Sequence, residues 1–387
     1  MKVLFVAENF RQGWGGGPES VRLMARRLAR FGVTSDVVDS SRVHRAVENL
    51  SVLPMDISGS SAFSLDTVEG YDALLQVGPW QNPLRTGEII RRRSKSKPYY
   101  YLPRGGLSRI EFEGLRNLKK FPYFAAIEAH FLRAADAVIY SSEAERGTMT
   151  RMNLGGAAGI IVPDYFEAPA VQGAERSWSD GFRLGFLAEI APRKGLLPFM
   201  RAFARWAPRQ PNRGSIQLSI GGGVRGGAER YFERVREVSA GIESTQVGYL
   251  GPVGHADRAA FYANTDLFVV PSLFESFGLT VLEAASAGCV LLCSPKVGAL
   301  EYFPPSSQVI ISDDAEPTGL EEALDRAAYL LARLADRQRS IDDAHGAVAA
   351  INDLADRRWA ELLHFEIDLA TDSAGAEALS RPAQGEA

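Results

Sequence analysis

Length, composition and charge place the chain among ordinary globular proteins with more than one domain. It has 387 residues, of which 46% are hydrophobic and 23% are charged, so a small disulfide-stapled module, a collagen-like chain and a disordered chain are excluded. The net charge of −4 reflects an acidic excess beyond residue 311, and no basic domain with interleaved aromatic residues indicates nucleic-acid binding.

The apolar segments and the cysteines indicate the compartment. The run 3–7 is too short for the core of a signal peptide, and no run reaches transmembrane length. Cys289 and Cys293 are too few for a disulfide framework and have no partners at zinc-ligand spacing. We therefore expect a cytoplasmic protein. The basic and aromatic segments 91–97 and 119–124 leave peripheral contact with an anionic membrane open, as an alternative to a solvated helix face.

Strand-like and helical segments alternate along the whole chain, which is typical of βαβ units around parallel sheets. Strands are predicted at 2–7, 33–38, 72–77, 98–102, 136–140, 159–163, 182–188, 215–220, 246–250, 266–271 and 289–293. Among the helices, one is predicted from Pro18 to Gly32, and others over 226–240 and 278–287. The segment 168–180 is small and polar without periodicity, so it is predicted as the linker between two doubly wound domains.

A glycine-rich loop follows the first predicted strand and precedes a helix. Gly15, Gly16 and Gly17 would let backbone N–H groups approach a phosphate, and the helix N-terminus adds positive potential. The loop lacks the Lys-Ser/Thr of a Walker A motif and the G-x-G-x-x-G spacing of dinucleotide binders. It is predicted as a phosphate contact, with a plain strand-to-helix turn as the alternative.

Two glutamates flank the start of the helix predicted over 278–287. Glu275 lies in the short loop before this helix, and Glu283 lies in its second turn. Carboxylates accept hydrogen bonds from sugar hydroxyls, and free N–H groups at a helix start can hold a diphosphate. The residues predicted to offer such backbone groups are Phe277, Gly278, Leu279 and Thr280.

A basic site is predicted near the start of the second half of the chain. Arg193 and Lys194 follow the predicted strand 182–188 and lie just before a helix. Adjacent Arg and Lys at the carboxyl edge of a sheet suit phosphate oxygens, the first through its fork and the second as a point charge. A solvated loop pair is the alternative.

The Glu-x7-Glu pattern, with its Phe-Gly and Glu-Ala flanks, resembles family 4 of the retaining glycosyltransferases, which have the GT-B fold. The segments 263–266 and 298–301 strengthen this resemblance. It implies an α/β architecture in which two doubly wound Rossmann-like domains face a cleft and a C-terminal helix crosses back to the first domain. The boundaries we predict are 1–167 for the acceptor-side domain, 168–350 for the donor-side domain, 351–370 for the crossover helix and 371–387 for a flexible tail.

The first half resembles a subgroup of this family that works in cell-surface polysaccharide assembly. The resemblance rests on the segments 77–80, 98–107 and 135–143, in which a Pro-Arg-Gly sequence is expected at the edge of the active site. Many relatives place a histidine near there, and none of the five histidines of this chain matches. Arg104 is the substitute candidate, with a turn arginine paired to a carboxylate as the alternative. The family's usual Gly-Arg pair is replaced here by a glycine and Phe186.

The resemblance implies transfer of a sugar, with retention, from a nucleoside diphosphate sugar to a saccharide or lipid-linked saccharide. Glu275 would bind hydroxyls of the transferred sugar and Glu283 those of the ribose, while Lys194 and Arg193 neutralise the leaving diphosphate. Asp-x-Asp is absent from the sequence, so neither a metal nor a further cofactor is expected. The alternatives are a nucleotide-sugar epimerase or phosphorylase of the same fold, and a non-catalytic relative that binds nucleotide sugar.

Overall fold

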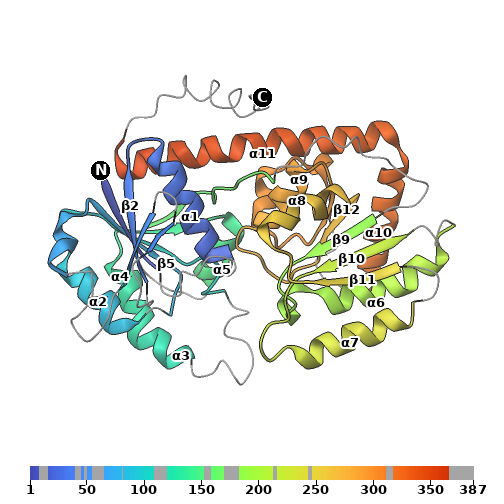
Figure 1. Cartoon of the computed structure of the whole chain (residues 1–387), viewed down its shortest axis with the longest axis horizontal. Coiled ribbons are helices and arrows are strands. Elements are labelled where there is room, and N and C mark those ends of the chain that lie inside the picture. The colour runs from blue at the N-terminus through green and yellow to red at the C-terminus, as the bar shows by residue number, and fades with distance from the viewer. Residues whose placement is uncertain are drawn as a thin grey trace, which may run out of the picture.

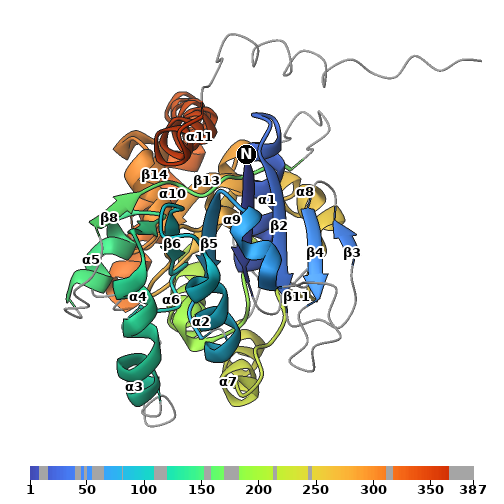
Figure 2. The same ribbon diagram turned by 90° about the vertical axis from the view of Figure 1, so that its left-hand side faces the viewer.

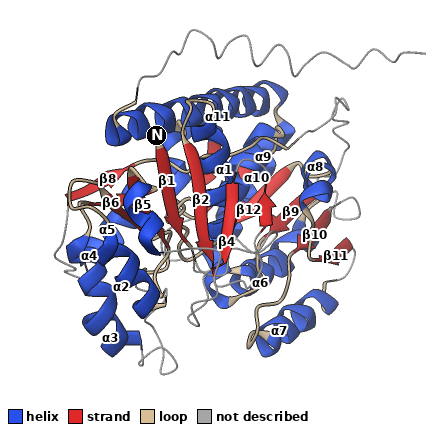
Figure 3. Cartoon of the chain, turned by 60° about the vertical axis from the view of Figure 1, so that its left-hand side comes forward, coloured by secondary structure: helices blue, strands red, loops and turns tan. Residues whose placement is uncertain are grey.

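Two helix-covered sheets lie side by side in the computed structural model of this protein (Figure 1). Figure 3 shows the strands of both sheets in the interior with helices around them. The structure describes residues 1–7, 16–39, 45–47, 50–54, 65–80, 82–108, 120–151, 158–169, 183–211, 216–242, 246–310 and 317–365. Within these ranges, no helix is both long enough and apolar enough to span a bilayer.

The first sheet has eight described strands in the order β3-β4-β2-β1-β5-β6-β7-β8, in which β3 and β4 form an antiparallel pair at one edge and the other pairs are parallel. The strands are β1 (Lys2–Val6), β2 (Thr34–Asp39), β3 (Arg45–Val47), β4 (Leu50–Pro54), β5 (Ala73–Val77), β6 (Tyr99–Leu102), β7 (Ala137–Tyr140) and β8 (Ala158–Ile161). Its helices are α1 (Gly16–Ala29), α2 (Pro83–Arg92), α3 (Lys120–Tyr123), α4 (Ala129–Ala134) and α5 (Glu143–Arg151).

The second sheet has six described strands, all parallel, in the order β11-β10-β9-β12-β13-β14. The strands are β9 (Arg183–Leu187), β10 (Gln217–Gly221), β11 (Gln246–Gly251), β12 (Leu267–Val270), β13 (Val290–Cys293) and β14 (Gln308–Ile310). Its helices are α6 (Leu196–Trp206), α7 (Glu229–Ala240), α8 (His255–Ala263), α9 (Leu279–Ser286) and α10 (Pro317–Ala332). The strand order reverses between β9 and β12, and the crevice beyond the carboxyl ends of such strands is where open α/β sheets bind ligands.

Every strand predicted from the sequence is present, with ends that differ by one or two residues, and the two doubly wound domains are confirmed. The prediction omitted β3, β4 and β14. The predicted linker 168–180 and tail 371–387 lie largely or wholly outside the described residues, and the domain boundaries stay predictions.

A single 30-residue helix, α11 (Leu334–Leu363), runs along both domains (Figure 1) and is seen nearly end-on in Figure 2. Its Val348 packs in a core cluster of the second domain, whereas Trp359 packs in a core cluster of the first. The buried Asp356 on the same helix accepts hydrogen bonds from Arg27 at 2.7 Å and from the Tyr165 hydroxyl at 2.9 Å. The crossing helix thus starts before residue 351, and it ties the two domains together.

Candidate active site

The loop between β12 and α9 holds Glu275 against the segment that follows β13. The backbone N–H of Glu275 donates to the carbonyl of Lys296, and the carbonyl of Glu275 accepts from the N–H of Gly298, both at 3.0 Å. Gly278 precedes α9 with φ of 103°, and a Cβ there would lie 2.9 Å from a methyl group of Val297, so this position requires glycine. The glutamate is therefore fixed at the N-terminus of α9.

The predicted diphosphate contacts lie at this helix start. Gly278 is the N-cap of α9, and Leu279 and Thr280 are its first two residues. The Phe277 side chain is buried in a core cluster of the second domain, so this residue offers its backbone only. The arrangement places free N–H groups and the positive end of the helix dipole beside Glu275.

Lys194 forms an ion pair with Glu275 across the carboxyl ends of β9 and β12. The Ser272 hydroxyl donates to the same carboxylate oxygen at 2.8 Å. The Lys194 side chain is 12% exposed and that of Glu275 is 15% exposed, so the pair is largely removed from water. Burial lowers the pKa of Lys194, and Glu275 partly offsets this. Burial alone would raise the pKa of Glu275, but the charge and hydrogen bond of Lys194 hold it below its ordinary value.

Arg193 lies next to Lys194 in the same turn, and Arg193, Lys194 and Glu275 form one charged cluster. Within this cluster Arg193 has a different ion-pair partner. Its guanidinium donates to Glu189 at 3.3 Å, and its carbonyl accepts from the N–H of Leu273 at 2.8 Å. Its charge also contributes to the lowered pKa of Glu275. Phe186, where the resemblance implies an arginine, is buried in the core of the second domain and cannot reach Glu275. The predicted cation pair is therefore built on one turn, with each cation beside a glutamate.

Glu283 is held by two side chains of α8 that no sequence motif indicated. Arg258 donates to one carboxylate oxygen at 2.8 Å and the Tyr262 hydroxyl to the other at 2.6 Å. Burial raises the pKa of Glu283, against the opposing effect of Arg258. A carboxylate offers about four lone-pair positions, so it can still accept from a ribose hydroxyl. The spacing of Arg258 and Tyr262 puts both on one helix face, but nothing in the sequence links that face to α9.

We expect Glu283→Ala to weaken nucleoside diphosphate binding about 5- to 150-fold, as the loss of one charged hydrogen bond of about 1–3 kcal/mol would. Isothermal titration calorimetry measures this. The exposed Glu233, which pairs with Arg236 on α7, gives the matched control Glu233→Ala, whose affinity should equal that of the parent. Equal affinity of Glu283→Ala and the parent would remove Glu283 from the donor site.

The part of the predicted glycine-rich loop that the structure describes is the start of α1, which lies across from α8. Gly15 falls outside the described residues, Gly16 begins α1, and a Cβ on Gly17 would meet no atom within 4 Å. Burial raises the pKa of Glu19 in the first turn of α1, but Arg22 outweighs it, and the charges of His255 and Arg258 add to the lowering. The start of α1 in the first domain thus faces the start of α8 in the second.

The first domain also contacts the loop that carries Glu275. The carbonyl of Ser276 accepts hydrogen bonds from the hydroxyls of Ser141 at 3.0 Å and Ser142 at 2.6 Å. The Glu301 carboxylate accepts from the backbone N–H of Glu143 at the start of α5, at 2.8 Å. These bonds join the predicted segments 135–143 and 298–301, so the position of the loop depends on the contact between the domains.

Arg104 lies beside this contact with φ of 48°. It forms an ion pair with Asp164, and both side chains are 7% exposed. Burial raises the pKa of Asp164, while Arg104 and the Ser20 hydroxyl oppose this. The arrangement is that of the paired arginine predicted as the alternative, and it leaves a catalytic role for Arg104 as a prediction without support from these contacts.

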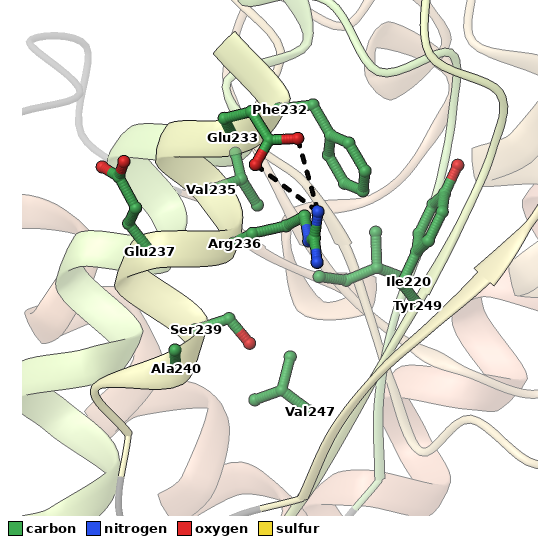
Figure 4. A pocket seen from close by; sticks show the side chains of 10 residues that line it. All are labelled: Ile220, Phe232, Glu233, Val235, Arg236, Glu237, Ser239, Ala240, Val247 and Tyr249. Atoms are coloured by element: carbon green, nitrogen blue, oxygen red, sulfur yellow. Dashed lines mark hydrogen bonds and ion pairs between the residues drawn. The ribbon is translucent and has the colours of Figure 1, made fainter. Parts of the chain in front are cut away.

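A cavity of about 460 Å³ lies between α7 and the edge strand β11 (Figure 4). Its walls include the rings of Phe232 and Tyr249, whose centres are 4.6 Å apart and whose planes are tilted by 54°, and Arg236, which donates to Glu233. None of the predicted site residues lines it, and it lies outside the carboxylate and lysine cluster. Among the described residues, no group of three or more His, Cys, Asp or Glu side chains is arranged to hold a metal ion.

Sequence comparison with known proteins gives matches to the second domain, which carries the Lys194–Glu275 pair. Residues 181–328 match the family described as "Glycosyl transferases group 1". The O-antigen chain mannosyltransferase B of Escherichia coli is 28% identical over 183 residues, which are 47% of this chain and 44% of that protein. The chain thus spans less than half the length of the curated relatives it matches.

Solved structures show similarity over both domains. Sucrose-phosphate synthase from Thermosynechococcus elongatus superposes with a TM-score of 0.70 at 17% identity, covering 94% of this chain and 98% of that one. Anabaena HepE, solved with UDP and glucose, gives 0.69 at 16% identity, covering 94% and 99%. The chain therefore has the two-domain GT-B fold of glycosyltransferases, and its second domain carries the match to glycosyl transferases group 1.

Proposed function

We propose that the protein is a retaining glycosyltransferase of family 4. It moves a sugar from a nucleoside diphosphate sugar to a hydroxyl of a saccharide or lipid-linked saccharide in surface polysaccharide synthesis, in the cytoplasm or at its membrane face. The observation that carries the proposal is the buried pair of Lys194 and Glu275 beside the N-terminus of α9. An Escherichia coli relative named a mannosyltransferase and the Anabaena structure with UDP and glucose support the substrate class.

The site can stabilise the leaving group without rearrangement. As the bond between the sugar and the diphosphate breaks, negative charge grows on the diphosphate oxygens. The Lys194 ammonium and the N–H groups at Gly278 to Thr280 are fixed in place before that charge develops, so they favour the transition state over the ground state. Glu275, ionised because Lys194 lowers its pKa, accepts hydrogen bonds from hydroxyls of the transferred sugar.

We expect a nucleoside diphosphate sugar to stabilise the protein with no divalent metal present, because Lys194, Arg193 and the α9 terminus supply the positive charge. At a ligand concentration of about 100 times Kd, mass action adds about 2.7 kcal/mol to the free energy of unfolding. Thermal-shift screening of nucleoside diphosphates and their sugars in excess chelator measures this. A shift that disappears in chelator and returns with magnesium would refute a metal-free site.

The same screen, followed by product analysis, separates the alternatives. Consumption of the donor without an acceptor would indicate an epimerase or a phosphorylase acting with phosphate. Stabilisation without turnover across a panel of acceptors would indicate a nucleotide-sugar-binding protein that lacks catalysis. Transfer of the sugar with its anomeric configuration kept is the result that the proposal requires.

A further inference from the structure

Trp80 has a backbone conformation that bulky residues rarely adopt. It follows β5 at the carboxyl edge of the first sheet, and its φ of 67° lies in the left-handed region, which disfavours a residue with a large side chain. Such conformations persist only where the surroundings over-determine them, and they concentrate at ligand sites. The contacts around Trp80 show what fixes it.

A buried carboxylate holds the backbone of Trp80. One oxygen of Glu128 accepts the Trp80 N–H at 2.6 Å, and the other accepts the Tyr101 hydroxyl at 2.7 Å. Glu128 is fully buried and ends the π-helical segment Phe124–Glu128, a local irregularity that is common at functional sites. Burying a carboxyl group costs folding free energy, and here the buried group is used to bind the backbone of this tryptophan.

The indole is fixed separately, because it packs against a core cluster of the first domain and bonds to a residue near the domain boundary. Its Nε1 donates to the carbonyl of Gly106 at 3.3 Å. The neighbouring Gly105 lies so close to the second domain that a Cβ would be 3.1 Å from the Ser276 hydroxyl oxygen. Since Ser276 follows Glu275 in the chain, the half-buried indole lies on the first-domain side of the proposed reaction centre.

The chemistry around the ring suits a sugar. The Lys120 ammonium lies 5.5 Å from the centre of the Trp80 ring, and the Tyr123 ring lies 5.6 Å away at 50°. A saccharide presents flat C–H faces, which pack on aromatic rings, and hydroxyls, which need polar partners such as an ammonium group. We propose that Trp80 is the stacking surface for the acceptor saccharide, with Lys120 as a polar contact; this rests on the proposed function.

The test uses the full chain, saturated with the nucleoside diphosphate that stabilises it most, and methyl α-mannoside, methyl α-glucoside and maltose as probes. Saturation-transfer difference NMR should show transfer to ring C–H protons of at least one probe with the parent. Trp80→Phe should keep part of this signal, and Trp80→Gly should lose about nine-tenths of it. Glycine tolerates the positive φ, so that variant keeps the loop unstrained, and its melting temperature should be no lower than that of Trp80→Ala.

Phe121, a 48% exposed aromatic residue on α3, gives the matched control Phe121→Ala, which should keep the full signal. Undiminished transfer with Trp80→Gly, or no transfer to any probe with the parent, would overturn the proposal. Steady-state kinetics add a second readout: Trp80→Phe should raise KM for the acceptor several-fold and leave KM for the donor unchanged. A parent that binds the glycosides but no nucleoside diphosphate would refute the proposed function and keep the Trp80 site.

Discussion

Replacing Lys194 with alanine is expected to lower turnover by about 10²–10³-fold, the usual effect of removing one preorganised group that stabilises developing charge. Lys194 is the cation that reaches the cluster beside α9 from the turn after β9. Donor affinity should fall less than turnover, because the N–H groups at the start of α9 still bind the ground-state diphosphate. Single-turnover kinetics under saturating donor separate the two effects.

The same substitution should destabilise the fold in a way that depends on pH. Without Lys194, the Glu275 carboxylate is buried with no ion-pair partner, which typically costs about 3–5 kcal/mol. In the parent the pKa of Glu275 is lowered, so its stabilising contribution is present at neutral pH and is lost as the pH falls through that pKa. In the variant, burial without the lysine raises the pKa of Glu275, so the unpaired carboxylate takes up a proton at a higher pH than in the parent, and its cost is relieved. The difference in unfolding free energy between parent and variant should therefore shrink as the pH falls from 7 towards 4.

Glu275→Gln in the Lys194→Ala background is the control for this interpretation. It removes the uncompensated charge, so the double variant should recover much of the stability that Lys194→Ala loses, while its turnover stays low. Recovery of turnover together with stability would show that Lys194 only compensates the buried glutamate and does not act on the leaving group.

Replacing Arg193 tests whether the turn after β9 supplies both of the cations that bind the diphosphate. Because its guanidinium also contacts Glu189, we expect Arg193→Ala to lower turnover by about tenfold, and the loss in the Lys194 double variant to be less than the product of the two. Full activity of Arg193→Ala would make it a surface residue. Arg225, 3.8 Å from the same glutamate, would then be the next cation to test.

The strands of both sheets could be predicted because most are short apolar runs buried on both faces, as the four residues of β12 and of β13 are. Two of the three omitted strands, β14 and β3, lack this signal. β14 has three residues and starts with Gln308, and β3, also of three residues, starts with Arg45 and pairs at an edge. Short edge strands are set by their neighbours in the sheet and by tertiary contacts, which local patterns do not encode.

The sequence predicted individual site residues, but it did not predict which of them form pairs. Lys194 and Glu275 are 81 positions apart, so their ion pair follows from β9 and β12 being adjacent in the sheet. Arg258 meets Glu283 because α8 and α9 pack beside each other, and neither residue belongs to a motif that names the other. The partner of Arg104 also could not be predicted. Arg104 lies in a motif, but its side chain is buried and pairs with the buried carboxylate of Asp164.

Adding a methyl group at Gly195 is expected to remove most activity while touching no charged group. Gly195 joins the Lys194 turn to α6 with φ of 70°, and a Cβ there would collide with the carbonyl oxygen of Pro271, next to the loop that carries Glu275. The left-handed conformation costs about 1 kcal/mol for alanine and the collision about 1–3 kcal/mol more, so the free energy of unfolding should fall by about 2–4 kcal/mol.

The collision should also move Lys194 away from Glu275, and a shift of about 1 Å can lower a rate about 10²-fold. Gly346 gives the matched control: it lies inside α11, and a Cβ there would meet no atom within 4 Å. Gly346→Ala should therefore raise the free energy of unfolding by about 0.4–1 kcal/mol and leave turnover unchanged. Chemical denaturation and turnover measured on both variants decide the matter, since parental stability and rate in Gly195→Ala would mean that the turn after β9 does not position the lysine.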